Sequence, residues 1–464
     1  MNNEPKLDKD GMEKVMTAKD YAGDSTGQVA MNAINAMSGQ MTYFYTNKVG
    51  MNPTVAGNIL LISKIADGIS DIVMGRLVDK TNTKDGKARP WLKWMIIPTL
   101  LAMILLFTVP KGGSGMQMAY GIATNVFASA VVYTAIAIPY YALINFQTRS
   151  QEERGKIGTC RGFLGYLITQ VIGIVLIPAT NALGGTQKSW IIVAAVLGVI
   201  GAICLTVCFK TTKERYGAHV TGVEAESTEE KLSTLESLKI LAHNKYWWMM
   251  MLSQSALSGV YTFMYGALAF YCMYVLGDDN LTALVSTVGL IPSVLGFVLS
   301  PIMIRKFGMR KTGMIGAGVG IVGTIIRIVA PANITVFILG NCLVTFATAP
   351  IVAVLPAMVI NCAEWNDYKY GVKIVGLTNS AASFGAKIGG GIAGAAIGWV
   401  LAAGGFDATA AVQSASAMTS IYAVNIWLPG ICLAIILVCY AFYSLEKKYV
   451  EIVKHNEARR AGKE

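Results

Sequence analysis

Runs of about twenty apolar residues recur along the whole chain and are separated by short polar connections. A helix of about 20 apolar residues is long enough to cross the ~30 Å hydrocarbon core of a bilayer, where every backbone polar group must be paired within the protein. The pattern therefore predicts an all-α integral membrane protein. The twelve predicted membrane-spanning helices lie near residues 26–46, 54–76, 91–110, 116–146, 158–180, 189–209, 246–276, 280–303, 312–331, 334–362, 375–402 and 418–444.

Lysine and arginine gather on alternate connections, and this placement predicts the orientation in the membrane. The opposite connections hold only Lys48, Lys111 and Lys188. Because an excess of Lys and Arg marks cytoplasmic connections, we expect both termini on the cytoplasmic side of the inner membrane. Thirty-two of the 38 Lys and Arg residues lie in or beside the two tails and the connections near 77–93, 147–157, 210–245, 304–311 and 363–374.

The longest charged connection divides the predicted helices into six and six. A weak internal repeat supports this division, since the basic segment GRLVDKTNTKDGKARP follows the second span and the basic segment PIMIRKFGMRKTG follows the eighth. Two six-helix halves joined by a cytoplasmic linker are typical of the major facilitator fold, in which the substrate binds between the halves. The predicted parts are a tail at 1–25, a half at 26–209, a linker at 210–245, a half at 246–444 and a tail at 445–464.

Composition and motifs narrow the class of protein further. Only 14% of the residues are charged, against about a quarter in soluble domains, and the net charge of +11 follows from the topology rather than from a nucleic-acid partner. The sequence contains no Walker, GxSxG or HExxH motif, so we expect no enzyme activity. Its eight cysteines include no CxxC pair, and we expect no resident cofactor. No cleaved signal peptide is visible, so the first span is expected to direct insertion.

The second predicted span, NILLISKIADGISDIVMGRLVDK, carries charged residues, which are costly to place in the hydrocarbon core of a bilayer. Lys64, Asp67 and Asp71 are spaced by three and four residues and share one helix face. Charges at this depth usually serve function or are paired. Two carboxylates beside an ammonium predict a site for a coupling ion, either Na⁺ bound by oxygen atoms or a proton, with Ser70 adding a hydroxyl. The alternative is a structural ion pair between Lys64 and Asp67.

Polar residues of the first span predict a substrate site. Asp24, Gln28 and Asn35 are separated by four and seven residues and form one stripe, which suits a ligand with many hydroxyl groups such as a sugar. The alternative is hydrogen bonding between helices. In AIPYYALINF, Tyr141 offers an aromatic face to a sugar and Asn145 offers an amide, although membrane tyrosines often serve as interface anchors.

Three further basic residues lie inside predicted spans. Lys387 lies in the glycine-rich SFGAKIGGGIAGAAIGWVL, where close helix packing would let it reach a central cavity, with snorkelling to the surface as the alternative. Arg161 occupies the matching place in the first half, where a substrate role and a structural role are both open. Arg327 lies near the outer end of its span and is expected to be a surface anchor.

An ordered set of segments resembles the glycoside–pentoside–hexuronide cation symporters, whose pattern has two acidic residues four apart, a GR-x-x-D segment and a basic loop ending in RPW. Together the segments cover nearly the whole chain. They are DGISDIVMGRLVDKTNTKDGKARPW, YFYTNKVGM, IPYYAL, QEERGKIGTCRGF, YVLGDD, AEWNDYKYGVKIVG and GLTNSAASFGAKIGGGIAG.

The resemblance implies roles for individual residues. It implies that Asp67 and Asp71 bind the cation with Ser70 and Thr134 as further ligands, and that Lys387 lies near both sites. It also implies that an acid of the first span, an aromatic residue after the fourth-span proline and a basic residue of the fifth span recognise sugar. These match Asp24, Tyr141 and Arg161. Asp20 is the rival for the first-span acid.

Several positions depart from the family pattern. Ala137 and Asn145 stand where acidic or polar residues are often found, and Asn361 replaces an acid near the end of the tenth span. Glu364 keeps a second acidic position there. We assign Glu364 to charge pairing, together with Lys64 and Lys387. Fewer cavity carboxylates put galactoside specificity in doubt and leave the coupling ion open.

The combined prediction is a monomeric carrier that moves a sugar or glycoside into the cell together with Na⁺ or a proton. Two alternatives are a carrier of a non-sugar solute, either lipid-like or an organic anion, and a sensor that binds sugar without transporting it. The sequence leaves open whether the sugar is neutral or anionic, because Arg161, Lys387 and Lys64 either pair a substrate carboxylate or pair protein acids.

Overall fold

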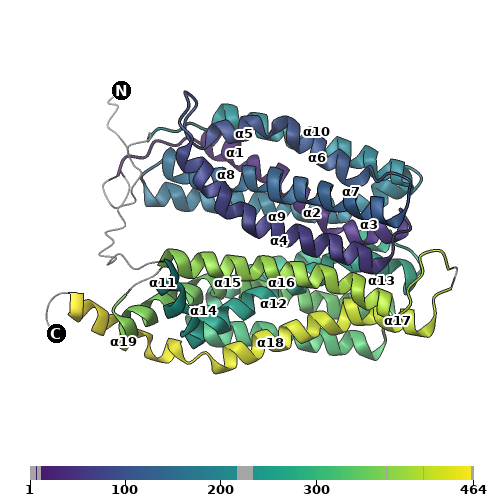
Figure 1. The fold of residues 1–464 in the computed structure, drawn as a ribbon. Coiled ribbons are helices and arrows are strands. Elements are labelled where there is room, and N and C mark those ends of the chain that lie inside the picture. Colours follow the sequence, from purple (N-terminus) through teal and green to yellow (C-terminus); the bar gives the residue numbers. More distant parts are fainter. Residues whose placement is uncertain (1–6, 8–11, 217–233, 373–374, 411, 461–464) are drawn as a thin grey trace. The chain divides into compact units, whose positions relative to one another are not determined.

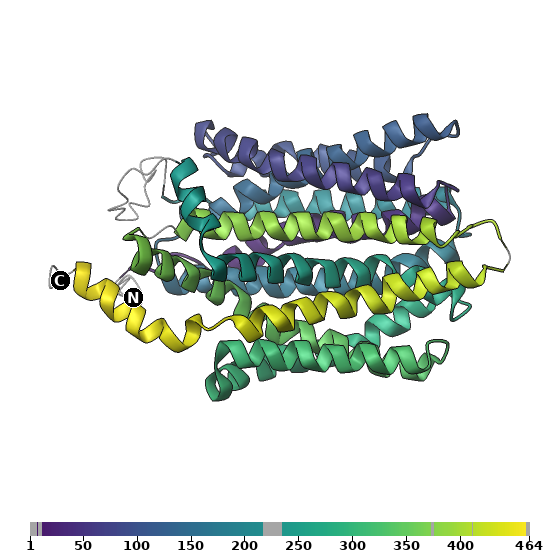
Figure 2. The ribbon, with the colours of Figure 1, turned by 60° about the horizontal axis from the view of Figure 1, so that its bottom comes forward.

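The computed structural model describes the chain except for residues 1–6, 8–11, 217–233, 373–374, 411 and 461–464. Parts of the predicted linker and of both predicted tails therefore lie outside the described residues. The chain divides into two compact units, Met1–Val223 and Glu224–Glu464. Within each unit the long helices run side by side (Figures 1 and 2). The described residues contain helices and two isolated β-bridges but no β-strand.

In the first unit, the predicted first span is a broken helix, because three separate helices follow one another between residues 18 and 47. The fourth span is also irregular, with a π-helical segment, η1, in its middle. The helices of this unit are α1 Ala18–Ser25, α2 Gly27–Gly39, α3 Met41–Asn47, α4 Pro53–Lys80, α5 Arg89–Trp94, α6 Ile96–Phe107, α7 Ser114–Val126, η1 Phe127–Tyr133, α8 Thr134–Gln147, α9 Gln151–Ala182 and α10 Gln187–Thr211.

In the second unit, one helical stretch covers two predicted spans and is interrupted at Gly308, whose φ is 81°. The last span contains a second π-helical segment, η2. The helices of this unit are α11 Thr234–Ala242, α12 Lys245–Gly266, α13 Leu268–Tyr274, α14 Leu281–Val329, α15 Ile334–Tyr370, α16 Val375–Ala403, α17 Ala415–Tyr422, η2 Ala423–Trp427, α18 Leu428–Phe442 and α19 Leu445–Arg460.

Eight helical stretches of the described chain are long and apolar enough to cross a membrane, which confirms the prediction of a multi-pass all-α protein. Residues 18–110, which hold the first three predicted spans, contribute none of the eight. Their helices are either short, as in α1–α3 and α5–α6, or carry charged residues, as in α4. The count of twelve spans stays a prediction.

The two loops that form the weak internal repeat each donate backbone hydrogen bonds to a carboxylate of their own unit. Glu214, just after α10, accepts hydrogen bonds from the backbone N–H groups of residues 87–89 at 2.8–2.9 Å. Glu446, at the start of α19, accepts hydrogen bonds from the N–H groups of residues 309–310 at 2.7 and 2.8 Å. The weak sequence repeat therefore corresponds to the same local structure in both units.

The expectation that Arg327 is a surface anchor is wrong. Its side chain is only 1% exposed, and Nη2 donates a hydrogen bond to the backbone oxygen of Asn425 at 2.9 Å. The guanidinium also lies over the ring of Phe337, 4.4 Å from its centroid. A π-helix shifts backbone hydrogen bonding from i−4 to i−5 and alters which carbonyls are paired within the helix. Arg327 thus binds the carbonyl oxygen of Asn425, which lies within the π-helical segment η2.

Candidate functional site

The acidic residues of α4 meet two hydroxyl groups in the first unit. Thr134 Oγ1, at the start of α8, lies 3.1 Å from Asp67 Oδ1 and 3.2 Å from Asp71 Oδ1. Ser70 Oγ lies 3.3 Å from the same Thr134 oxygen. The structure thus brings together all four residues that were predicted to bind the cation, and we call them the acidic cluster.

Lys64 supplies a positive charge beside this cluster. Its Nζ lies 3.7 Å from Asp67 Oδ2, while Asp67 itself is 2% exposed and the Lys64 side chain is 36% exposed. The cluster therefore offers carboxylate and hydroxyl oxygens, the type of ligand that hard cations take in proteins. Within the described residues, no group of three or more His, Cys, Asp or Glu side chains is arranged to hold a metal ion.

Thr134 takes its position from the π-helical segment η1, which ends one residue before it. The wider turn of a π-helix rotates the following residues relative to a regular helix, and such segments are frequent at functional sites. The sequence of η1, FASAVVY, contains no proline or glycine that would signal this irregularity. Only the family resemblance indicated Thr134.

A groove of about 380 Å³ opens between α2, α8 and α9 of the same unit. Ligand-binding pockets of proteins have volumes of about 300–1,000 Å³. Of the predicted substrate residues, Gln28, Tyr141 and Arg161 line this groove. The full lining consists of Gln28, Asn32, Tyr141, Ile144, Gly158, Arg161, Gly162, Gly165 and Tyr166.

Three glycines of α9 create the space for the groove. Gly158, Gly162 and Gly165 are spaced by four and three residues, so they lie on one face of the helix. A Cβ atom at Gly158 or Gly162 would meet nothing within 4 Å, and a Cβ atom at Gly165 would come within 3.1 Å of the amides of Gln28 and Asn32. The sequence analysis missed this stripe, although its helical spacing around Arg161 was visible.

The amide groups of the groove are oriented by one another. Asn32 Nδ2 donates to Gln28 Oε1 at 2.9 Å, and Thr169 Oγ1 donates to Asn32 Oδ1 at 3.1 Å. Tyr141 is 51% exposed, so its ring offers a flat face to a ligand in the groove. This combination of amides and exposed aromatic surface can bind hydroxyl groups together with the apolar face of a sugar ring.

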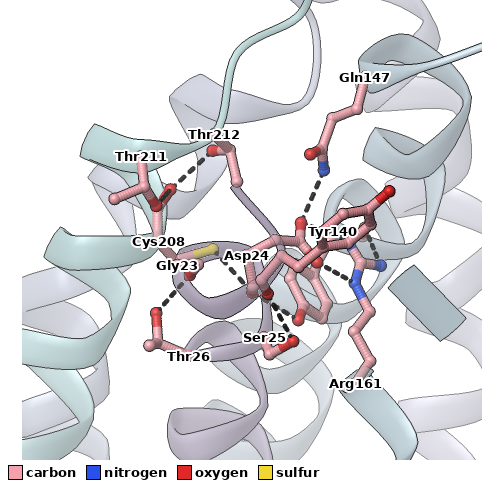
Figure 3. Close-up of polar contacts among 11 residues, drawn as sticks. Gly23, Asp24, Ser25, Thr26, Tyr140, Gln147, Arg161, Cys208, Thr211 and Thr212 are labelled. Atoms are coloured by element: carbon pink, nitrogen blue, oxygen red, sulfur yellow. Dashed lines mark hydrogen bonds and ion pairs between the residues drawn. The ribbon is translucent and has the colours of Figure 1, made fainter. Parts of the chain in front are cut away.

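Asp24 and Arg161 form a buried ion pair beside the groove. Arg161 Nε lies 2.6 Å from Asp24 Oδ2, and Nη2 lies 2.7 Å from Oδ1. Figure 3 shows Arg161 and Gln147 reaching the same carboxylate, with the Tyr140 ring next to the guanidinium. Asp24 is completely buried and does not line the groove. Asp24 belongs to α1, and the turn residue Thr26 lies between it and Gln28 of α2.

Asp20, the rival for the first-span acid, has different partners. Its Oδ2 lies 3.1 Å from Arg215 Nη2, and it closes the N-terminal capping box of α1 with Thr17. The geometry thus places Asp24, rather than Asp20, against Arg161.

The other predicted site residues lie elsewhere. Asn35 and Asn145 are exposed and do not line the groove. Lys387 belongs to α16 of the second unit, where it is partly buried. Glu364 lies near the end of α15, where its backbone oxygen and Oε2 accept hydrogen bonds from Asn456 of α19. The predicted roles of these four residues stay predictions.

Comparison with known proteins identifies the family. Residues 23–447 match the family described as MFS/sugar transport protein. The chain is 28% identical over 431 residues to the isoprimeverose transporter of Lactiplantibacillus pentosus, with 89% of this chain and 86% of the relative covered. It is 27% identical over 454 residues to the putative glycoside/cation symporter YagG of Escherichia coli, with 96% of each chain covered.

The fold agrees with this assignment. A crystal structure of a D-xylose–proton symporter superposes with a TM-score of 0.64 at 13% identity, covering 92% of this chain and 97% of that one. The chain therefore belongs to the MFS/sugar transport protein family, and its expected resemblance to the glycoside–pentoside–hexuronide cation symporters of the major facilitator superfamily is confirmed.

Proposed function

We propose that this protein carries a sugar or glycoside across the membrane together with a monovalent cation, Na⁺ or a proton. The observation that carries the proposal is the acidic cluster, because Asp67 and Asp71 are gathered around the Thr134 hydroxyl rather than facing lipid. The groove lined by Gln28, Tyr141 and Arg161 is the proposed sugar site in the same unit.

Helix α8 links the two proposed sites. Thr134, its first residue, contacts the acidic cluster, and Tyr141, two turns later, lines the groove. A cation bound by Asp67 and Asp71 would change the hydrogen bonds that their carboxylates share with Thr134. A sugar that contacts Tyr141 would bind the same helix. If the cation raises the affinity for sugar through this helix, the sugar must raise the affinity for the cation by the same factor, because binding free energies are linked.

The relatives support the choice of substrate and mechanism. One relative is named as a transporter of isoprimeverose and another as a glycoside/cation symporter. The distribution of Lys and Arg supports cytoplasmic termini in an inner membrane, and inward transport follows if the cation gradient points inward. We further propose that the carrier acts as a monomer without a resident cofactor, and that Lys387 and Glu364 contribute to charge pairing during transport.

Uptake into proteoliposomes tests the proposal. Labelled glycosides would be offered under an imposed Na⁺ gradient or an imposed pH gradient, applied separately. Uphill uptake driven by one gradient is expected, and Asp67→Asn and Asp71→Asn are each expected to abolish it. Asp85→Asn is the matched control, since Asp85 lies in the loop before α5 and pairs with Lys93 at 3.6 Å.

The outcomes separate the alternatives. Uptake that responds to neither gradient nor to the two substitutions would contradict cation coupling. Binding of sugar without any transport would identify a sensor. Folded protein that neither binds nor transports any glycoside would favour a carrier of a lipid-like solute or an organic anion.

A further inference from the structure

The second unit contains a buried arginine that belongs to neither proposed site. Arg327, near the end of α14, is 1% exposed, and no Asp or Glu of the described residues forms an ion pair with it. Arg161, the other buried arginine of the described chain, has Asp24 as its partner. Arginine stays protonated at neutral pH, and a buried charge without a partner is strongly unfavourable. Arg327 therefore needs a counter-charge.

The groups that contact the guanidinium of Arg327 are all neutral. Within the described residues, Nη2 donates to the backbone oxygen of Asn425 at 2.9 Å and also to its Oδ1. The guanidinium lies over the ring of Phe337, and the ring of Tyr271 stacks on Phe337 with the centroids 4.3 Å apart. Carbonyl oxygens and ring faces attract a cation, but they carry no net charge that could balance it.

One N–H group of the guanidinium has no acceptor. Arg327 Nε is enclosed by the protein and forms no hydrogen bond with any described residue. Buried polar groups almost always have a partner, and an exception points to a water molecule or an ion at that place. A water molecule would satisfy the N–H group but would leave the charge unbalanced. An anion would satisfy both requirements.

Two glycines make room for the side chain of Arg327. A Cβ atom at Gly340 of α15 would come within 2.5 Å of Arg327 Cγ. A Cβ atom at Gly323, one turn before Arg327 on α14, would come within 2.5 Å of the Gly340 backbone oxygen. The arginine thus lies where α14 and α15 pack most closely, and this enclosure favours a small ligand over a large one.

We propose that Arg327 holds a small inorganic anion, chloride, in the second unit. The anion accepts a hydrogen bond from Nε and supplies the counter-charge, while Asn425 fixes the guanidinium through Nη2. It thereby stabilises the packing of α14 against α15 and η2. The site lies away from the acidic cluster and the groove, so the inference does not depend on the proposed function.

Thermal unfolding of the purified protein in detergent tests the site. The midpoint would be compared in sodium chloride and in sodium gluconate of equal concentration, so that any effect of Na⁺ on the acidic cluster is the same in both. Because a ligand that binds only the folded state stabilises it, chloride is expected to raise the midpoint by at least ~2 °C, with saturation at high concentration. Bromide, which resembles chloride in size and charge, is expected to act in the same way.

Two variants remove the need for the anion by opposite changes. Arg327→Met removes the buried charge, and Asn425→Asp places a carboxylate where Oδ1 contacts Arg327. Each variant is expected to have the same midpoint in chloride and in gluconate. In gluconate, Asn425→Asp is also expected to unfold at or above the midpoint of the unmodified protein, because it supplies the missing charge.

Arg459→Met is the matched control in the same unit. It removes an arginine that already has a carboxylate partner, Asp367, and it is expected to keep the full response to chloride whatever its own midpoint.

Three results would overturn the inference. The first is an equal midpoint of the unmodified protein in chloride, bromide and gluconate. The second is a chloride response that persists in Asn425→Asp, or in Arg327→Met, if that variant folds. The third is stabilisation by an anionic lipid and not by halides, which would assign the guanidinium to a lipid phosphate. Each of these results leaves the proposed transport standing, since uptake tests it separately.

Discussion

At the scale of single residues, the first unit separates its charges into two sets. Arg161 is paired with Asp24, and Lys64 lies 3.7 Å from Asp67 of the acidic cluster. Buried charges are stable only when they are paired and hydrogen-bonded. Asp24 and Arg161 thus form an ion pair beside the groove, while the carboxylates of Asp67 and Asp71 share the hydroxyl of Thr134 and are the oxygen ligands of the proposed cation.

The hydroxyl of Thr134 is the clearest residue-scale test of the cluster. Thr134→Ala removes an oxygen that lies within 3.2 Å of both carboxylates. A single hydrogen bond or ligand of this kind contributes on the order of 1 kcal/mol. We therefore expect the half-saturating cation concentration for uptake to rise about three- to tenfold. Thr134→Ser keeps the oxygen and should stay near the original value. Equal behaviour of the two variants would contradict a role for the hydroxyl.

At the scale of elements, the proposed sites depend on places where helices depart from regular geometry. Asp24 lies in the short helix α1, next to the turn at Thr26, and Thr134 directly follows the π-helical segment η1. The groove depends on α9, which is a regular helix that lacks side chains on one face, at Gly158, Gly162 and Gly165. Space for a ligand is therefore made by removing side chains from one rigid helix.

Filling this space should block the sugar without disturbing the fold. A Cβ atom at Gly162 meets no neighbour within 4 Å, so Gly162→Val is expected to insert its methyl groups into the groove. We expect sugar uptake to fall at least tenfold while the thermal unfolding midpoint in detergent stays the same or rises, because Gly is a poor helix former. Gly155→Val is the matched control on α9, since its Cβ also meets nothing and it does not line the groove. Full uptake by Gly162→Val would show that the groove is not the sugar site.

At the scale of the whole molecule, the two units share one local structure, a loop whose backbone is bound by a glutamate. Each has a glycine with positive φ just before the loop residues that a carboxylate of the same unit binds. These are Gly86, with a φ of 108°, next to Glu214, and Gly308, with a φ of 81°, next to Glu446. A Cβ atom at either glycine would come within 2.6 Å of its glutamate. The two units therefore share this local structure.

This shared local structure predicts that removing either glutamate side chain destabilises the protein by a similar amount. Glu214→Ala and Glu446→Ala each leave backbone N–H groups without their acceptor, and such a loss costs about 1–3 kcal/mol where water cannot replace it. Both variants are expected to lower the unfolding midpoint in detergent, by similar amounts. Lys447→Ala, beside Glu446 on α19, should leave it unchanged. A midpoint that falls for one glutamate variant only would contradict the equivalence of the two loops.

By itself, the sequence determined the membrane class, the helical architecture and the family, because apolar run length, charge placement and collinear motifs are properties of local stretches of chain. It also predicted Asp67 and Asp71 as cation ligands, because their spacing on one helix needs no knowledge of other helices. Only the tertiary structure decided that Asp24 belongs with Arg161, 137 residues away, and that Arg327 is buried. Such pairings depend on how separate helices are broken and packed, and spacing along one helix does not encode the position of its neighbours.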